Sequence, residues 1–234
     1  MKTHIQDKTK LVNSVFSKVY KKYDFMNDIM SLGVHRLWKK DMINWMKPQS
    51  DHKIIDVASG TGDLAKIISK KNNNLNQIYC IEPNKDMLKT GEKKLSTYKN
   101  IKWTLASAEN LPFKDNTFDF YTISYGIRNV TDINLCLKEA YRVLKTGGRF
   151  ICLEFSKVEN ELFYKIYRQY SKAIPIIGKY FVGDADPYNY LVDSIEKFYN
   201  QKELLNLMEK NNFLNVEYRN LSNGISAIHS GWKI

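Results

Sequence analysis

From residue 53 onward, short apolar runs alternate with amphipathic stretches along the chain. Such alternation is typical of βα units that build a mostly parallel sheet, so the pattern predicts an α/β fold. Strands are expected over residues 54–58, 78–81, 101–105, 118–123, 149–154, 216–221 and 225–229. Helices are expected over residues 64–69, 84–95, 134–144 and 202–210, the third of them closed by Gly147-Gly148.

Two segments flank this regular pattern. Residues 1–47 carry apolar side chains at helical spacing, which predicts an N-terminal helical cover. Residues 157–200 are expected to form a helical insertion rich in aromatic residues. We expect a single domain, with a βα core over 53–156 and a C-terminal helix and β-hairpin over 201–234. Open α/β sheets bind ligands at the carboxyl ends of their strands, and both flanking segments are expected over that edge.

The composition narrows the class of protein. A hydrophobic content of 43% is enough for a full core and excludes a disordered chain. No apolar run approaches the roughly 18–20 residues that cross a bilayer, and the first residues lack the apolar stretch of a secretory signal. Cys80, Cys136 and Cys152 are far apart and form no CxxC pair, which argues against disulfides or structural zinc. These features favour the cytoplasm or an organelle matrix.

The formal net charge of +11 is concentrated near the N-terminus. Residues 1–47 hold ten Lys and Arg side chains against four Asp, an excess of +6. The excess is almost all lysine and accompanies no motif of a nucleic-acid reader, so nucleic acid is not expected as a partner. Two interpretations stay open. The simpler one is that the genome favours Lys and Asn codons, so that solvent-exposed positions are often lysine. The other is that the lysines attract the protein to an anionic membrane surface.

The sharpest motif lies where the first strand turns into a helix, at Asp56-Val57-Ala58-Ser59-Gly60-Thr61-Gly62-Asp63. Its two glycines permit a tight turn and a close approach of the backbone to a ligand, and the helix start adds outward N–H groups. Glu82 follows 22 residues after Gly60, at the end of the second strand, where a carboxylate can accept both hydroxyls of a ribose. The motif therefore predicts a nucleoside ligand.

Two kinds of nucleoside ligand fit this loop. Residues 60–65 satisfy the dinucleotide pattern GxGxxA, which is typical of NAD(P)-dependent oxidoreductases. In such a site the loop faces a pyrophosphate, which the carboxylates of Asp56 and Asp63 would repel. A sulfonium amino acid instead brings positive charge, so the two acids favour S-adenosylmethionine (SAM). A third interpretation is that the glycines only make the turn and the acids only cap the helix.

The rest of the core favours SAM. Ser107-Ala108-Glu109 follows the third strand at the place of an adenine ring, and the fourth strand ends at Ser124-Tyr125, beside the expected methionine moiety. This arrangement resembles the Rossmann-like class I SAM-dependent methyltransferases. The resemblance implies a seven-stranded, mostly parallel sheet with helices on both faces and a last strand that runs antiparallel.

A narrower resemblance covers residues 11–234. Its motifs are similar to those of the ubiquinone/menaquinone biosynthesis C-methyltransferase family, at residues 23–38, 122–132, 142–156 and 184–191. Two loop positions depart from the family pattern, since Ser59 stands where glycine is common and Thr146 where proline is usual. The resemblance implies an enzyme that transfers a methyl group from SAM to a ring carbon of a prenylated quinol, without a metal. A non-catalytic quinone-pathway assembly module on the same fold is a further alternative.

The resemblance leaves open which quinol is the substrate. It could be demethylmenaquinol of the menaquinone branch, 2-polyprenyl-6-methoxy-1,4-benzoquinol of the ubiquinone branch, or both. We expect a cytoplasmic protein, on the matrix side if mitochondrial; whether it also contacts the surface of the inner membrane, from which a lipid substrate would come, stays open. Whether the partner is a second copy of the chain or a quinone-biosynthesis complex also stays open.

The resemblance assigns roles to individual residues. For SAM they are Gly60, Thr61 and Gly62 at the methionine end, Glu82 at the ribose, Ser107 and Ala108 at the adenine, and Ser124 near the methyl group. Asp56 is expected behind them as a hydrogen-bond acceptor. For the quinol we expect Arg128 and Asn129, where a cation can stabilise a phenolate or polarise a water that takes its proton.

Alternatives stay open at several of these positions. Arg128 and Asn129 could only fix their own loop, and His35 could be either a base or a structural hydrogen-bonding residue. Tyr23 and Asp24 are expected in the cover over SAM, with a helix-capping role as the alternative for Asp24. The aromatic insertion is expected either to line a tunnel for the prenyl tail or to pack in the core.

Overall fold

The computed structural model describes residues 28, 31, 33–159, 165, 169 and 186–234. Tyr23, Asp24 and most of the aromatic insertion lie outside these residues, so the expectations for them stay predictions. In the part of the chain that is described, no helix has both the length and the apolar character needed to cross a bilayer.

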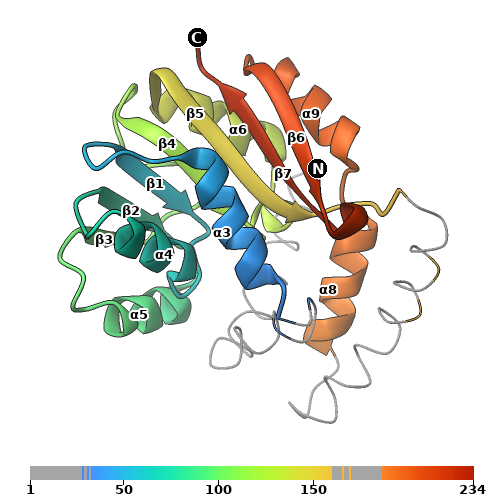
Figure 1. Ribbon diagram of the computed structural model, residues 1–234, viewed down its shortest axis with the longest axis horizontal. Coiled ribbons are helices and arrows are strands. Elements are labelled where there is room, and N and C mark those ends of the chain that lie inside the picture. Colours follow the sequence, from blue (N-terminus) through green and yellow to red (C-terminus); the bar gives the residue numbers. More distant parts are fainter. Residues whose placement is uncertain (1–27, 29–30, 32, 160–164, 166–168, 170–185) are drawn as a thin grey trace.

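A single sheet of seven strands forms the centre of the described chain (Figure 1). The strands are β1 (Lys53–Val57), β2 (Gln77–Ile81), β3 (Ile101–Thr104), β4 (Phe118–Ser124), β5 (Leu144–Phe155), β6 (Leu214–Leu221) and β7 (Ser226–Trp232). Their order is β3-β2-β1-β4-β5-β7-β6; the first four pairings are parallel, and β7 runs antiparallel to β5 and β6. The predicted sheet is confirmed. Its order reverses between β1 and β4, which is where open α/β sheets form a ligand crevice.

Helices cover both faces of this sheet, as predicted. They are α3 (His35–Met46), α4 (Asp63–Lys71), α5 (Lys85–Lys94), α6 (Ile133–Val143), α8 (Asp186–Glu196) and α9 (Gln201–Lys210), with short 3₁₀ turns η2 (Ile127–Asn129) and η3 (Ser222–Gly224). One core cluster joins the sheet to α3, α4 and α8, and a second joins its other face to α6 and α9. Figure 1 shows α3 crossing its face of the sheet between α4 and α8.

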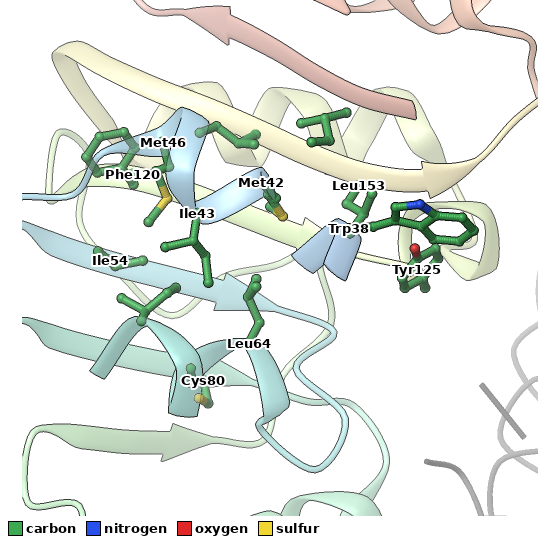
Figure 2. Close-up of a cluster of buried hydrophobic side chains, with 14 of the residues drawn as sticks. Trp38, Met42, Ile43, Met46, Ile54, Leu64, Cys80, Phe120, Tyr125 and Leu153 are labelled. Atoms are coloured by element: carbon green, nitrogen blue, oxygen red, sulfur yellow. The ribbon is translucent and has the colours of Figure 1, made fainter. Parts of the chain in front are cut away.

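Successive side chains of β1 enter the two different clusters. Ile54 belongs to the cluster under α3 and α4, whereas Ile55 belongs to the cluster under α6 and α9. Figure 2 shows Met42 and Ile43 of α3 in the same cluster as Ile54 and Leu64. Full burial of such a side chain stabilises the fold by about 1.5–3 kcal/mol. The helix α3, which lies within the predicted cover, is therefore fixed to the core by its own apolar side chains.

Side-chain caps determine where three helices begin. Asn84 caps α5, Asp132 caps α6, and Asn200 forms a reciprocal capping box with Glu203 at the start of α9. Each such cap stabilises a helix by roughly 1 kcal/mol. Asn84 lies two residues beyond Glu82, and Asp132 lies three beyond Asn129, so two of the caps also fix the ends of loops that carry predicted site residues.

The junction of α6 and β5 differs from the prediction. The helix α6 ends at Val143, and Leu144 is already extended (φ −70°, ψ 141°) as the first residue of β5. The prediction that Gly147-Gly148 caps this helix is therefore wrong. Gly147 lies inside β5 with a φ of 78°, and its N–H donates to the carbonyl of Lys233. Val143 and Leu144 are both fully buried, so the apolar run passes from helix to strand without an intervening loop.

Candidate functional site

The loop after β1 has the left-handed turns that its glycines predict. Gly60 has a φ of 59°, and Gly62 has a φ of 83° at the N-cap of α4. A Cβ at Gly62 would lie 2.6 Å from Leu95 Cδ1 and 3.0 Å from the ring of Trp103. Glycine is thus required at position 62 both by the backbone conformation and by the close packing of α5 and β3 behind the loop.

Glu82 binds this loop directly. Its Oε2 accepts a hydrogen bond from the Gly60 N–H at 2.8 Å, and its Oε1 accepts one from the Asn84 N–H at 2.9 Å. The side chain is buried, and this burial raises the pKa of the carboxyl to about 7 although both hydrogen bonds act in the opposite direction. The end of β2 and the glycine loop are therefore one unit, with the remaining lone pairs of Glu82 available to further donors.

A pocket opens at the carboxyl ends of β1 and β4, in the predicted crevice. Its lining includes Asp56, Gly60, Thr61, Ser124 and Tyr125. Asp56 Oδ1 accepts a hydrogen bond from the Thr122 hydroxyl at 2.9 Å, while Asp56 Oδ2 and Ser124 Oγ are buried without a hydrogen-bond partner among the described residues. Buried polar atoms are normally paired, so these two oxygens indicate a polar ligand in the pocket.

Burial also dominates the protonation of Asp56. The side chain is almost fully buried, which raises the pKa of its carboxyl to about 7 despite its hydrogen bond to Thr122. A cationic ligand group beside Asp56 would favour the ionised form. The sequence placed Asp56 behind the contact residues, whereas the structure places its free oxygen at the pocket itself.

A residue that the sequence analysis missed lines the same pocket. Lys39 of α3 is buried, and its Nζ lies 3.5 Å from Asp63 Oδ2. Asp63 also binds Lys94, with Nζ at 2.8 Å from Oδ1. The two lysines lower the pKa of Asp63 to about 2 although burial opposes them, so this carboxylate is charged at neutral pH. Lys39 brings the predicted cover into contact with the glycine loop.

Ser107 and Ala108 lie on the loop after β3 and do not line this pocket. Their loop is held by the next residue, because Glu109 Oε1 accepts hydrogen bonds from the backbone N–H groups of Thr131 at 2.6 Å and Asp132 at 3.3 Å. The loop thus joins the segment that carries Arg128 and Asn129.

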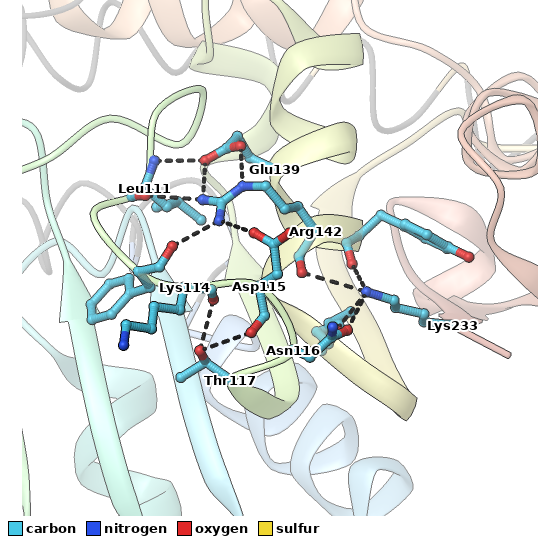
Figure 3. A network of polar contacts seen from close by, with 11 residues as sticks. Leu111, Lys114, Asp115, Asn116, Thr117, Glu139, Arg142 and Lys233 are labelled. Carbon is cyan, nitrogen blue, oxygen red and sulfur yellow. Dashed lines mark hydrogen bonds and ion pairs between the residues drawn. The ribbon is translucent and has the colours of Figure 1, made fainter.

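Arg142 of α6 holds the continuation of that loop (Figure 3). Its guanidinium donates to the carbonyls of Leu111 and Phe113 and to the carboxylates of Asp115 and Glu139, at distances from 2.6 to 3.0 Å. Glu139 in turn accepts the Leu111 N–H at 2.8 Å. This network explains why an arginine opens the motif at residues 142–156: it fixes the loop between β3 and β4.

Arg128 follows β4 in η2 and is buried in a paired state. Its Nη1 lies 2.6 Å from Glu154 Oε1 and donates to the Tyr125 carbonyl at 2.8 Å, and its Nε donates to Ser194 Oγ at 3.4 Å. Asn129 accepts a hydrogen bond from the hydroxyl of Tyr190 at 3.0 Å. The two predicted substrate residues therefore connect the ends of β4 and β5 with α8.

A second cavity of about 560 Å³ lies beside this pair. Arg128, Tyr190 and Ser194 line it together with Phe198 and Tyr199. Its volume falls in the range of small-molecule sites, and its lining combines aromatic rings with polar groups. Tyr190, Phe198 and Tyr199, three aromatic residues of the segment 157–200, thus line a cavity.

His35 has a structural environment. Its ring Nδ1 lies 3.0 Å from Ser31 Oγ and 3.8 Å from Asp28 Oδ1, and burial lowers its pKa to about 4. It does not line either cavity described above. Within the described residues, no three His, Cys, Asp or Glu side chains are placed to hold a metal ion.

The sequence is similar to one family of methyltransferases over almost its whole length. The model of the ubiE/COQ5 methyltransferase family matches residues 2–233. The chain is 52% identical to the ubiquinone/menaquinone biosynthesis C-methyltransferase UbiE of Rickettsia akari, over 96% of this chain and 93% of that one. It is 49% identical to the UbiE protein of Brucella abortus, over 97% of this chain and 87% of that one.

Solved structures share the fold at much lower identity. A SAM-dependent methyltransferase from Thermotoga maritima aligns with a TM-score of 0.67 at 23% identity, covering 94% of this chain and 99% of the other. A phosphoethanolamine N-methyltransferase from Haemonchus contortus, solved with SAM, aligns with a TM-score of 0.61 at 12% identity, covering 84% and 52%. The class I methyltransferase fold that the sequence resembled is confirmed.

Proposed function

Because the chain belongs to the ubiE/COQ5 methyltransferase family, we propose that it transfers the methyl group of SAM to a ring carbon of a prenylated quinol. Family membership confirms the resemblance noted in the sequence, an enzymatic role and SAM as the methyl donor. It favours the SAM interpretation of the glycine loop over the dinucleotide one. The proposed substrates are demethylmenaquinol and the polyprenyl methoxybenzoquinol, by analogy with the names of the relatives.

The residues of the first pocket fit the methionine end of SAM. When bound, SAM supplies a methyl group on a positively charged sulfur. Gly60 and Thr61 line the pocket at this end, Gly62 makes the turn into α4 next to them, and Ser124 Oγ has no hydrogen-bond partner among the described residues. The observation that carries the proposal is this unpaired oxygen together with Asp56 Oδ2, because a ligand with a cationic amino-acid end satisfies both.

The same proposal places the nucleoside along the edge of β2 and β3. Glu82 is the ribose acceptor, since both of its oxygens keep lone pairs beyond their bonds to Gly60 and Asn84. Ser107 and Ala108 contribute the adenine side, on a loop held by Glu109 and Arg142. These are the roles that the sequence analysis assigned to the three residues.

On the substrate side we assign Arg128 and Asn129, beyond the end of β4. A quinol becomes a carbon nucleophile when its hydroxyl loses a proton and the resulting negative charge spreads to the neighbouring ring carbon. The guanidinium of Arg128, held by Glu154 and Tyr125, also lines the second cavity, where its N–H groups would donate to the oxygen of such an anion. Tyr190 orients the Asn129 amide for the same task.

The proposed reaction is tested by incubating the purified chain with methyl-labelled SAM and short-chain versions of both quinols under reducing conditions. We expect the label in a carbon-bound methyl group of the extracted quinone, released together with S-adenosylhomocysteine. Transfer to one quinol or to both assigns the branch. Binding of S-adenosylhomocysteine without transfer to either quinol would contradict the proposed substrate class.

We further propose that the chain works in the cytoplasm and contacts a membrane surface transiently, because its substrate is a lipid. The excess of +6 over residues 1–47 supports attraction to anionic lipids, which falls with ionic strength. Sedimentation with anionic and neutral vesicles at low and high salt tests this. Equal sedimentation with both vesicle types would contradict it.

A further inference from the structure

Lys39 places a positive charge deep in the first pocket. It comes from α3, and its residue is 7% exposed. The neighbours on the same helix, Met42 and Ile43, belong to the core, so the lysine backbone is fixed rather than free to swing away. A lysine in this position must present its ammonium to the pocket that it lines.

The ammonium group of Lys39 has unused hydrogen-bonding capacity. It carries three donors, and within the described residues its ion pair is with Asp63 Oδ2 at 3.5 Å, a loose contact. The same Asp63 already holds Lys94 at the shorter distance of 2.8 Å. Lys39 therefore shares its carboxylate with a second lysine that lies closer to it. A buried cation in this state favours an incoming anion.

The same pocket also offers a group for a ligand cation. Asp56 Oδ2 is buried and has no hydrogen-bond partner among the described residues. Lys39 is close enough to act on Asp56 electrostatically. The ammonium of Lys39 and the Oδ2 atom of Asp56 therefore lie in one pocket. This pair of charges is complementary to the carboxylate and ammonium of an α-amino acid. A thioether ligand without the amino acid would use neither group.

We propose that Lys39 binds the carboxylate of the amino-acid moiety of SAM and so makes the enzyme specific for the intact amino acid. This inference rests on the proposed function and deepens it. Lys39 releases its loose contact with Asp63 in part and donates to the ligand carboxylate, while Lys94 keeps Asp63 neutralised. The helix α3 thereby contacts the methionine end of the ligand.

The test uses two ligands that differ only in the part concerned. S-Adenosylhomocysteine carries the whole amino acid, whereas 5′-methylthioadenosine has the same nucleoside and thioether without it. We expect Lys39→Met to weaken binding of S-adenosylhomocysteine in isothermal titration by about 10- to 100-fold, the usual size of a lost charged hydrogen bond. Binding of 5′-methylthioadenosine should stay within about twofold.

Lys40→Met is the matched control, because Lys40 is the next residue of α3, carries the same charge and is exposed. It should leave both affinities unchanged. Lys39→Arg keeps the charge and should recover part of the loss for S-adenosylhomocysteine. The unsubstituted chain should bind decarboxylated S-adenosylhomocysteine as weakly as the Lys39→Met variant binds the full ligand. This measurement tests the inference even if the variant folds poorly.

Two results would overturn the inference. One is equal weakening of both ligands by Lys39→Met, which would mean that Lys39 only supports the pocket. The other is equal affinity of the unsubstituted chain for S-adenosylhomocysteine and its decarboxylated form. That result would contradict the inference about Lys39 but not the proposed use of SAM as methyl donor. Binding of neither adenosyl ligand by the unsubstituted chain would instead overturn the proposed function along with the inference.

Discussion

Glu82 accepts the backbone N–H of Gly60 at 2.8 Å, so the last carboxylate of β2 holds the turn that follows β1. The other oxygen of the same carboxylate holds Asn84, which caps α5. One buried side chain therefore links two neighbouring βα turns of the sheet. The Glu82 carboxylate that we assign to the ribose therefore also fixes the loop at the methionine end of the proposed SAM site. A change at Glu82 should affect both ends of that site.

Glu82→Gln should damage both binding and stability. An amide has one oxygen, so it can accept from only one of Gly60 and Asn84, and its NH₂ then faces the other N–H. Leaving a buried donor unpaired costs about 1–3 kcal/mol of unfolding free energy. We expect that loss in chemical denaturation and at least a tenfold weaker binding of S-adenosylhomocysteine. Glu92→Gln, an exposed position on α5, should change neither quantity; a Glu82 variant that behaves like this control would contradict the assignment.

Gly62→Ala separates backbone strain from steric overlap when it is compared with Gly147→Ala. Both glycines have a left-handed backbone, with φ values of 83° and 78°. A Cβ at Gly147 meets nothing within 4 Å, whereas one at Gly62 lies 2.6 Å from Leu95 and 3.0 Å from Trp103. We expect about 1 kcal/mol of destabilisation at Gly147, and 1–3 kcal/mol more at Gly62 together with weaker SAM binding. Equal destabilisation by the two substitutions would show that Leu95 and Trp103 adjust without cost.

The affinity for S-adenosylhomocysteine should rise with pH and level off only above the pKa of Asp56, which is about 7. The pKa of Asp56 is raised to about 7 by burial, so below pH 7 its carboxyl is protonated in the free protein and must lose a proton to meet the ammonium of the ligand. His35 and Asp63, with pKa values of about 4 and 2, keep their charge states between pH 5.5 and 7.5. Binding in that window therefore releases protons, and lower pH opposes it.

The control for this pH dependence is again 5′-methylthioadenosine. Glu82 also has a pKa of about 7, but it meets the ribose, which both ligands share. The ratio of the two affinities isolates the amino-acid end, and this ratio should increase from pH 5.5 to 7.5 in the unsubstituted chain. Asp56→Asn should make the ratio independent of pH. A flat ratio before substitution would exclude Asp56 as the partner of the ligand ammonium.

Much of this architecture could be predicted from local patterns. The strands, the glycine loop and Glu82 follow from apolar periodicity and from the residue types that end a parallel strand, which are local properties of the sequence. The start of β5 could not be predicted in this way, because Val143 and Leu144 form one apolar run and the change from helix to strand depends on pairing with β4. Gly147-Gly148 suggested a helix end but belongs to the strand.

Lys39 shows a limit of another kind. In a basic N-terminal segment, one lysine among many looks like solvated surface. A signal was nevertheless present, since His35, Trp38 and Met42 are buried on the same side of α3, and Lys39 falls on that stripe. A lysine on an apolar stripe indicates a partner, but its identity depends on the packing of α3 over the glycine loop. The pairing of Arg128 with Glu154 was hidden for the same reason, because 26 residues separate them in the sequence.

The two interpretations of Arg128, substrate contact or loop fixing, can be separated with its partner Glu154. Both side chains are buried, at 3% and 1% exposure, so Arg128→Met leaves the Glu154 carboxylate without its counter-charge and should cost about 3–5 kcal/mol of unfolding free energy. Adding Glu154→Gln removes that carboxylate, and replacement of both charges is often close to neutral. The double variant should therefore regain most of the stability and still bind S-adenosylhomocysteine.

Turnover by that double variant then decides the role of Arg128. If the guanidinium stabilises the quinol anion, methyl transfer should stay at least about 100-fold below that of the unsubstituted chain although the fold has recovered. If Arg128 only fixes η2 through Glu154 and the Tyr125 carbonyl, turnover should recover together with stability. Denaturation midpoints, the affinity for S-adenosylhomocysteine and the rate of labelled methyl transfer, measured on the single and double variants, distinguish the two. We expect stability without turnover, because the charge of Arg128 is held rigidly where β4 and β5 end, at the edge of the sheet that faces the ligand crevice.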